Sequence, residues 1–201
     1  MPGTQVRTEA EPSSPATRTV WSKQHVNVLK LLNENGRYTA KRGYIVGDLQ
    51  DHAAFILEAY DWYVQKVSAK YPRPAGVSYP VWVSLSLENA MIPSENTVIL
   101  EMEIDERAIM PININKWSAI LNYSYIARDR DDERRHRLLL ERYGTSDAQA
   151  YMTSFYPQIK KEIVLSWDRL FDDSIAINDN RMAYGTVWEL RREWITNVTK
   201  Y

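Results

Sequence analysis

The amino-acid sequence predicts an α+β fold, with a mostly antiparallel sheet flanked by helices, in a single domain that follows a disordered N-terminal tail. Residues 79–87 and 97–104 support the sheet, because apolar and polar side chains alternate there with the period of a β-strand. Residues 51–70 and 157–171 support the helices, because apolar residues recur there at three- and four-residue spacing. A chain of 201 residues has the length of one domain.

The two ends of the predicted domain follow from composition. Residues 1–19 are rich in Pro, Ser, Thr, Glu and Ala, which is typical of a disordered tail, so the domain is expected to span residues 20–201. The tail lacks the apolar core of a signal peptide, and the chain has no run of about 18 apolar residues. These features argue against a membrane role and favour a cytoplasmic location.

Composition also excludes several classes of site. The net charge of −1 argues against a dominant nucleic-acid-binding role. The chain has no cysteine, so disulfides and thiolate chemistry are excluded, and a reducing compartment is favoured. Its three histidines, at positions 25, 52 and 136, lie far apart, and no metal site is predicted. No glycine-rich phosphate loop and no Gly-x-Ser-x-Gly motif is present.

The elements before the first alternating segment are expected to be helical. Order should begin at residues 20–24, and a short helix should follow and end at Asn35-Gly36, where glycine permits the left-handed conformation of a helix cap. The longer helix over residues 51–70 should end at residues 71–76, which contain two prolines.

The alternating segments predict a sheet with two different faces. One face collects apolar side chains, namely Tyr79, Val81, Val83, Leu85 and Leu87 with Val98, Leu100, Met102 and Ile104. The other face presents Trp82, several hydroxyl groups and the carboxylates of Glu101 and Glu103. Such a face is typical of a binding surface and equally of an ordinary solvated sheet.

Two later segments fit more than one structure. Residues 116–126 and 185–194 match both a helix and a strand, so their type stays open. Residues 127–143 predict a surface helix that Gly144 ends, because acidic residues come first and basic residues follow, as the helix dipole favours. Pro157 suits the first turn of the following helix.

Seven residues are candidates for a functional site: Trp21, Gln24, Arg37, Trp82, Ser84, Asn122 and Glu189. The first three could line one edge of a pocket, or could be an anchored aromatic ring beside solvated polar groups. Asn122 lies among aromatic residues and is expected to be buried. If residues 185–194 form a strand, Glu189 projects from the sheet beside Trp188, which suits a functional carboxylate.

Three charged residues outside this set have a structural and a functional interpretation. His136 is a candidate general base, although a histidine without a nearby partner in the sequence is more often structural. Asp168 and Arg169 are expected to clamp a neighbouring element by salt bridges in preference to taking part in catalysis.

The chain resembles an uncharacterised bacterial family known only as a domain of unknown function, DUF3841. The segments that carry the likeness are Trp21–Gln24, Gly36–Tyr38, Tyr79–Trp82, Thr97–Glu101, Lys116–Trp117, Ile120–Tyr123, Tyr125–Ile126, Ser166–Phe171 and Val187–Leu190. The likeness covers nearly the whole chain apart from the tail, and it implies no activity.

The order of elements is also similar to that of ADP-ribosyltransferase folds. This second resemblance implies NAD as a substrate, with Gln24 contacting the nucleotide, Trp82 and Ser84 holding the nicotinamide, and Glu189 as the catalytic carboxylate. The chain departs from that class because no Glu-x-Glu or Gln-x-Glu pair precedes Glu189.

Two functions therefore stand as expectations. The first is a domain that binds a small-molecule or nucleotide-like ligand, which includes an ADP-ribosyltransferase-like enzyme. The alternative is a non-enzymatic partner-binding or regulatory module that uses a surface rich in Trp and Tyr, residues that are common at interfaces. Nucleic-acid binding through Arg37, Lys41, Arg42 and the cluster at residues 128–137 is disfavoured, because acidic residues are mixed into that cluster. The sequence indicates no certain cofactor and no oligomeric state.

Overall fold

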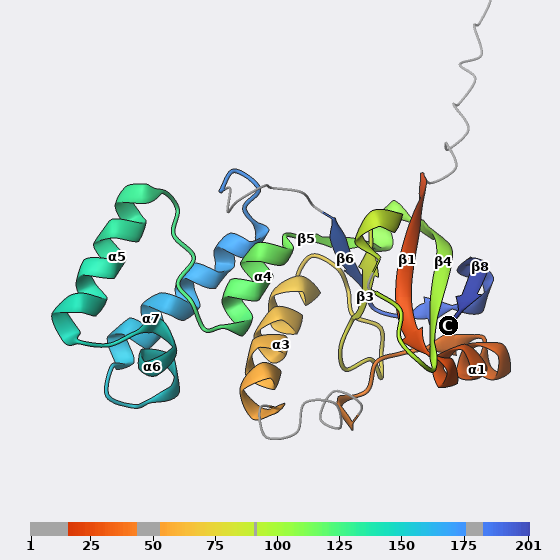
Figure 1. The fold of residues 1–201 in the computed structure, drawn as a ribbon, viewed down its shortest axis with the longest axis horizontal. Coiled ribbons are helices and arrows are strands. Elements are labelled where there is room, and N and C mark those ends of the chain that lie inside the picture. Colours follow the sequence, from red (N-terminus) through yellow and green to blue (C-terminus); the bar gives the residue numbers. More distant parts are fainter. Residues whose placement is uncertain (1–15, 44–52, 91, 176–182) are drawn as a thin grey trace, which may run out of the picture.

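A computed structural model describes residues 16–43, 53–90, 92–175 and 183–201 and confirms the α+β class. Its main sheet has six antiparallel strands in the order β5-β6-β3-β1-β4-β8, and a second sheet pairs β2 with β7 (Figure 1). The strands are β1 (Thr17–His25), β2 (Arg37–Tyr38), β3 (Val81–Ser84), β4 (Thr97–Asp105), β5 (Met110–Ile112), β6 (Tyr184–Val187), β7 (Leu190–Arg191) and β8 (Ile195–Lys200).

The α-helices lie at both ends of this sheet. They are α1 (Val26–Asn35), α3 (Ala53–Ser68), α4 (Ile114–Leu121), α5 (Arg130–Tyr143), α6 (Asp147–Met152) and α7 (Pro157–Ser166). Helix α1 lies beside β1 and β4, whereas α3 and α4 lie at the other end and connect the sheet to α5, α6 and α7 (Figure 1). In the described chain no helix is long and apolar enough to span a membrane.

The local signals for helix ends are confirmed. Gly36 and Gly144 follow α1 and α5 with φ angles of 71° and 60°, the left-handed conformation that glycine adopts without a steric penalty. Pro157 occupies the first turn of α7, where the missing N–H has no cost. Two segments fit both a helix and a strand in the sequence. Of residues 116–126, residues 116–121 belong to α4, and residues 185–194 contain the end of β6, all of β7 and a 3-10 helix (Arg192–Trp194).

Alternation is confirmed in β4 and only in part in β3. Val98, Leu100, Met102 and Ile104 have no exposed surface. Leu87, expected on the buried face of the first alternating segment, is instead 63% exposed. It lies in a short 3-10 helix (Leu87–Asn89), because β3 ends at Ser84 and the strand period no longer applies.

The predicted tail boundary at residue 19 is wrong by at least three residues. Strand β1 begins at Thr17, and its polar start is held by main-chain pairing, with Thr17, Arg18 and Thr19 opposite the end of β4. Backbone hydrogen bonds do not depend on side-chain polarity, so composition misplaced this boundary. Residues 1–15 lie outside the described residues.

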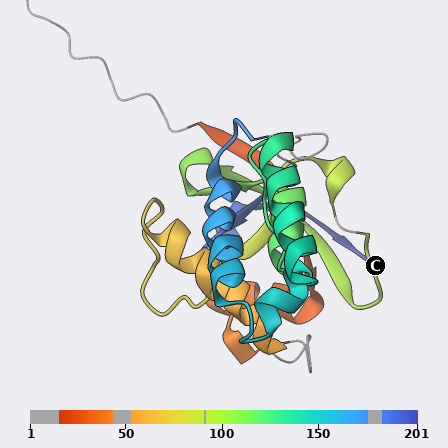
Figure 2. The ribbon, with the colours of Figure 1, turned by 90° about the vertical axis from the view of Figure 1, so that its left-hand side faces the viewer.

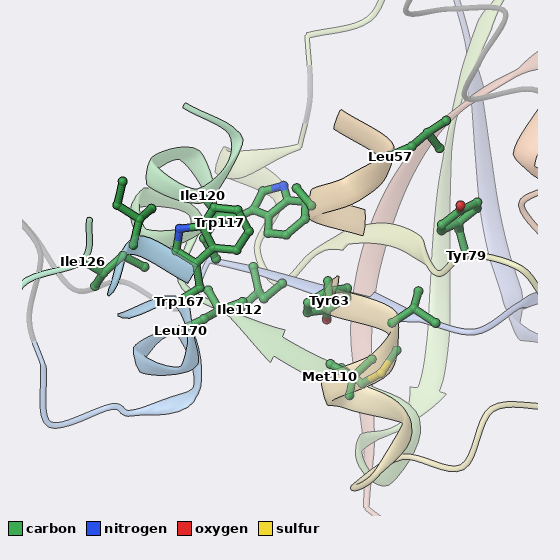
Figure 3. Close-up of a cluster of buried hydrophobic side chains, with 14 of the residues drawn as sticks. Leu57, Tyr63, Tyr79, Met110, Ile112, Trp117, Ile120, Ile126, Trp167 and Leu170 are labelled. Carbon is green, nitrogen blue, oxygen red and sulfur yellow. The ribbon is translucent and has the colours of Figure 1, made fainter. Parts of the chain in front are cut away.

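Two clusters of buried side chains pack against opposite faces of the sheet. On one face, Val20, Val83 and Leu100 pack with Val28 and Leu32 of α1. The other face contributes Met110 and Ile112, which pack with Tyr63 of α3 and Trp117 of α4 (Figure 3).

The second cluster is rich in aromatic rings at the join between sheet and helices. The ring of Trp117 lies 5.2 Å from that of Tyr60, 5.4 Å from that of Tyr63 and 5.6 Å from that of Trp82. These separations are favourable for edge and tilted contacts. The aromatic residues of α3, α4 and β3 therefore form one packed unit.

Salt bridges join the helices, as expected for Asp168 and Arg169. Asp168 pairs with Lys66 of α3 at 2.5 Å, and Arg169 pairs with Asp132 of α5 at 2.9 Å. The buried His136 is also structural in its contacts, since its ring nitrogens lie 2.7 Å from Asp147 of α6 and 3.0 Å from Glu162 of α7.

We expect Gly185→Ala to lower the free energy of unfolding by about 1–3 kcal/mol, because overpacking forces a closely packed site to shift. A Cβ at this buried strand position would lie 2.9 Å from Ile109 Cγ2 and 3.2 Å from the Met110 carbonyl oxygen. Chemical denaturation measures the change. Gly43→Ala is the matched control, since a Cβ there meets nothing within 4 Å, and equal effects for both variants would contradict the prediction.

We also expect a pH-dependent contribution of His136 to stability. Burial lowers its pKa, but hydrogen bonds to Asp147 and Glu162 outweigh burial and raise it above the ordinary value. A raised pKa means that the stabilisation is complete below pH ~6.5 and is lost as pH rises through the folded-state pKa.

Denaturation at several pH values between 6 and 9 tests this expectation. The other groups that face His136 are the Tyr125 ring, stacked at 3.9 Å, and Arg135, which shares Glu162. The difference in unfolding free energy between the natural chain and His136→Gln should shrink as pH rises. A difference that is constant over this range would show that the protonated ring is not what joins the helices.

Candidate functional site

A cavity opens where β1 and β3 stop pairing. Strand β1 pairs with β4 along its whole length, but it pairs with β3 only at Trp21 and Ser84. The cavity has a volume of about 260 Å³. Its lining residues are Trp21, Ser22, Lys23, Gln24, Tyr38, Ala40, Tyr60, Pro80, Val81, Trp82, Val83, Ser84 and Tyr184, and we call it the aromatic cavity.

Side-chain hydrogen bonds replace the backbone hydrogen bonds that β1 and β3 do not form beyond Trp21 and Ser84. The Ser22 hydroxyl donates to the Trp82 carbonyl oxygen at 2.8 Å and accepts from the Gln24 amide nitrogen at 2.7 Å. Ser22 is 2% exposed, so these bonds satisfy polar groups that burial would otherwise leave unpaired. They also hold the amide of Gln24 at the cavity wall.

The aromatic wall is held by the packed core behind it. The Trp82 indole N–H donates to the Tyr60 hydroxyl at 3.0 Å, and both rings pack on Trp117. Burial raises the pKa of Tyr60, and the hydrogen bond from Trp82 only partly offsets this, so Tyr60 is a neutral phenol that can still donate its proton. Because the rings are already ordered, stacking on them costs little conformational entropy.

One polar group of the aromatic cavity has no partner. The indole nitrogen of Trp21 is buried and makes no hydrogen bond within the part of the chain that the structure describes. A buried donor of this kind costs about 1–3 kcal/mol and calls for an explanation. The atom has almost no accessible surface, so a molecule in the cavity would reach it only after the indole ring turned.

The sequence of the chain is similar to that of one known family. Residues 19–196 match the model of a family described as Domain of unknown function (DUF3841). The chain belongs to the DUF3841 family. No curated protein and no solved structure matches it. These comparisons give no support to the likeness to ADP-ribosyltransferases.

Four of the seven candidates lie together in this DUF3841 protein: Trp21, Gln24, Trp82 and Ser84 line the aromatic cavity. Sequence reasoning missed Ser22, Lys23, Tyr38, Tyr60 and Tyr184. Tyr184 joins the site because it pairs with Ser84 across β6 and β3, a register that alternation alone does not reveal.

Glu189 and Arg37 do not line the aromatic cavity. Glu189, 7% exposed, lies between β6 and β7, where one carboxylate oxygen accepts from Arg191 at 2.6 Å and the other pairs with Arg37. Both oxygens are therefore engaged by guanidinium groups that flank the β2–β7 pair. The catalytic role expected for Glu189 stays a prediction, and its contacts are those of a structural clamp.

Asn122 is exposed, so the expectation of burial is wrong. Helix α4 ends at Leu121, and Asn122 caps it by donating from its side-chain amide to the Ser118 carbonyl oxygen at 2.8 Å. Tyr123 follows with a φ of 57°, which turns the chain out of the helix. The position thus has a local role at a helix end.

We expect Glu189→Gln to lower the free energy of unfolding by about 1–2 kcal/mol, because it removes the buried negative charge that Arg37 and Arg191 share. The expected loss of stability is modest because Arg37 and Arg191 are about half exposed, and water screens their charges. Urea denaturation measures the loss. Glu193→Gln is the control, since Glu193 is exposed and its carboxylate lies at the longer distance of 3.4 Å from Arg191. This variant should lower the free energy of unfolding by less than about 0.5 kcal/mol. An undiminished stability in Glu189→Gln would leave the carboxylate free for another role.

Proposed function

We propose that this DUF3841 protein is a ligand-binding domain whose aromatic cavity takes a nucleotide-like molecule, meaning a planar ring that carries hydrogen-bond acceptors or negative charge. The observation that carries the proposal is the opening between β1 and β3, which gathers aromatic rings and polar groups from five separate parts of the chain. Concave sites with apolar walls and a few convergent polar groups are the usual form of a small-molecule site.

The rings support a planar ligand. Trp21, Trp82, Tyr60 and Tyr184 all line the aromatic cavity, and the faces of such rings favour stacking with flat heterocycles. The volume of about 260 Å³ is near the lower end of the roughly 300–1,000 Å³ typical of ligand pockets. A single ring system with a short substituent therefore fits this cavity better than a whole dinucleotide.

The polar groups support a ligand with acceptors. Gln24 offers an amide, and Lys23 offers an ammonium group that also donates to the Ile92 carbonyl oxygen at 2.7 Å. None of the described lining residues is acidic, so the cavity favours neutral or anionic groups over cations.

Two other functions, NAD cleavage and partner binding, receive less support. Cleavage of NAD would require a carboxylate at the reacting centre, and Glu189 is engaged elsewhere by Arg37 and Arg191. A partner-binding surface rich in tryptophan would require exposed rings, but three of the seven tryptophans, Trp117, Trp167 and Trp188, are buried and the other four are half-buried. Ligand binding without NAD cleavage is the function that these contacts favour.

Thermal denaturation in the presence of NAD, mononucleotides, free bases and simple anionic metabolites tests the proposal. A ligand at 100 times its dissociation constant adds about 2.7 kcal/mol, which raises the Tm of a chain of this size by roughly 5–10 °C. Gln24→Ala should abolish most of this shift, because the amide lines the cavity while its loss removes only one hydrogen bond to Ser22.

Gln65→Ala is the matched control, since Gln65 is an exposed glutamine of α3 that does not line the aromatic cavity. It should leave the ligand-induced shift unchanged. If no member of the panel raises the Tm, or if both variants reduce the shift equally, the aromatic cavity is not a ligand site. A larger shift with NAD than with any mononucleotide would contradict the size argument.

A further inference from the structure

A second hollow lies on the surface that α5 and α7 share, away from the aromatic cavity. Figure 2 shows the two helices side by side, α5 in green and α7 in blue. The hollow has a volume of about 580 Å³. Its charged lining consists of Arg128, Arg135, Lys161 and Arg169 with Asp132 and Glu162, and we call it the basic hollow.

The Asp132 carboxylate of the basic hollow is already saturated by the protein. Asp132, 6% exposed, accepts from the Tyr125 hydroxyl, the Arg128 backbone N–H and the Arg169 guanidinium at 2.9–3.0 Å. Burial would raise the pKa of Asp132, but these bonds hold it well below its usual range, so the group stays ionised. The two acids therefore neutralise part of the charge and offer little to a cation.

One oxygen of Glu162 is likewise engaged. It accepts from Arg135 at 2.6 Å and lies 3.0 Å from the His136 ring nitrogen. Four cationic side chains against two carboxylates leave an excess of two positive charges in a chain whose net charge is −1. The excess is local, and it lies in a concave surface, where a field is concentrated.

The arginines are held in place before any ligand arrives. The Tyr125 ring stacks on His136 at 3.9 Å, and the guanidinium carbons of Arg169 and Arg135 lie 5.0 and 5.7 Å from its centre. Arg169 also donates to the Ile126 carbonyl oxygen through the nitrogen that bonds Asp132. Its other nitrogens have no hydrogen-bond partner among the described residues, so ordered donors remain available.

The rim of the hollow adds two exposed cations that the protein holds loosely. Lys161 is exposed and makes no ion pair with any described residue. The Arg128 side chain is 65% exposed, and its Nε lies 3.7 Å from the Asp132 carboxylate, beyond hydrogen-bond distance. Both can turn toward a ligand at little cost.

We propose that the basic hollow binds a phosphate group of a small phosphorylated molecule or the free ion. Phosphate oxygens accept from several directions at once, which matches guanidinium and ammonium donors on both helices. An extended polyanion is a poorer match, because the exposed Asp131 and Glu133 on the first turn of α5 would repel it. This site is independent of the aromatic cavity and of its proposed ligand.

Titration calorimetry with inorganic phosphate, against sodium chloride of equal ionic strength, tests the proposal on the full chain. Lys161→Ala and Arg128→Ala should each weaken phosphate binding at least about fivefold, because each removes a charged donor. Arg134→Ala is the matched control, since Arg134 is exposed on α5 and does not line the hollow. Neither rim residue is buried, so the variants should fold, and circular dichroism checks this.

The relative affinities distinguish a phosphorylated small molecule from the free phosphate ion as the ligand. Glycerol phosphate that binds tighter than inorganic phosphate supports a phosphorylated small molecule, and the reverse order supports the free ion. No phosphate binding up to about 20 mM, or an equal loss in Arg134→Ala, would overturn the proposal. It would also be overturned if a single-stranded oligonucleotide bound far more tightly and Arg134→Ala weakened that binding as much as the rim variants do. Gln24→Ala should leave phosphate binding unchanged.

Discussion

The unequal pairing of β1 is the constraint on which the candidate site depends. Nine residue pairs join β1 to β4, and this register fixes which face of the sheet each side chain of β1 lies on. Only one pair joins β1 to β3, and the sheet is therefore open beyond Trp21 and Ser84. Backbone groups exposed by such an opening must find other partners, and the Ser22 side chain provides one by bonding the Trp82 carbonyl oxygen.

The aromatic packing at the end of the sheet gives this opening a rigid wall. Trp117 of α4 contacts the rings of Tyr60, Tyr63 and Trp82, so side chains from two helices and a strand hold one another in place. Tyr63 is also bonded to the Thr186 hydroxyl at 2.8 Å in the buried interior, which ties α3 directly to β6. The cavity is thus the edge of the core, and its shape is maintained by the same contacts that stabilise the fold.

A buried carboxylate organises the helical end of the molecule in a comparable way. Asp132 bonds to Tyr125, Arg128 and Arg169, and so holds the chain before α5 and the chain after α7 against one another. A buried charge is tolerated only when it is paired and hydrogen-bonded, and the guanidinium groups gathered for this purpose produce the positive surface of the basic hollow. The structural requirement and the proposed anion site have one origin.

The sequence by itself determined the elements whose signals are local. Alternation in residues 97–104 and the glycines after α1 and α5 were sufficient, because a strand face and a helix end depend on neighbouring residues. It also identified Trp82 and Ser84 as candidates, because they stand on the polar face of an alternating segment, and Trp21 and Gln24 as a possible pocket edge.

Only the tertiary structure decided which candidates meet. Period-two alternation says which residues share a face but not which strands are neighbours, so Tyr184 could be placed beside Ser84 only by the β3–β6 register. The ion pairs of Glu189 with Arg37 and of Asp132 with Arg169 join residues far apart in the chain, and no local pattern encodes them. The tertiary structure thus separated Glu189 from the aromatic rings, because long-range pairing, and not local periodicity, sets where a charged side chain finds its partner.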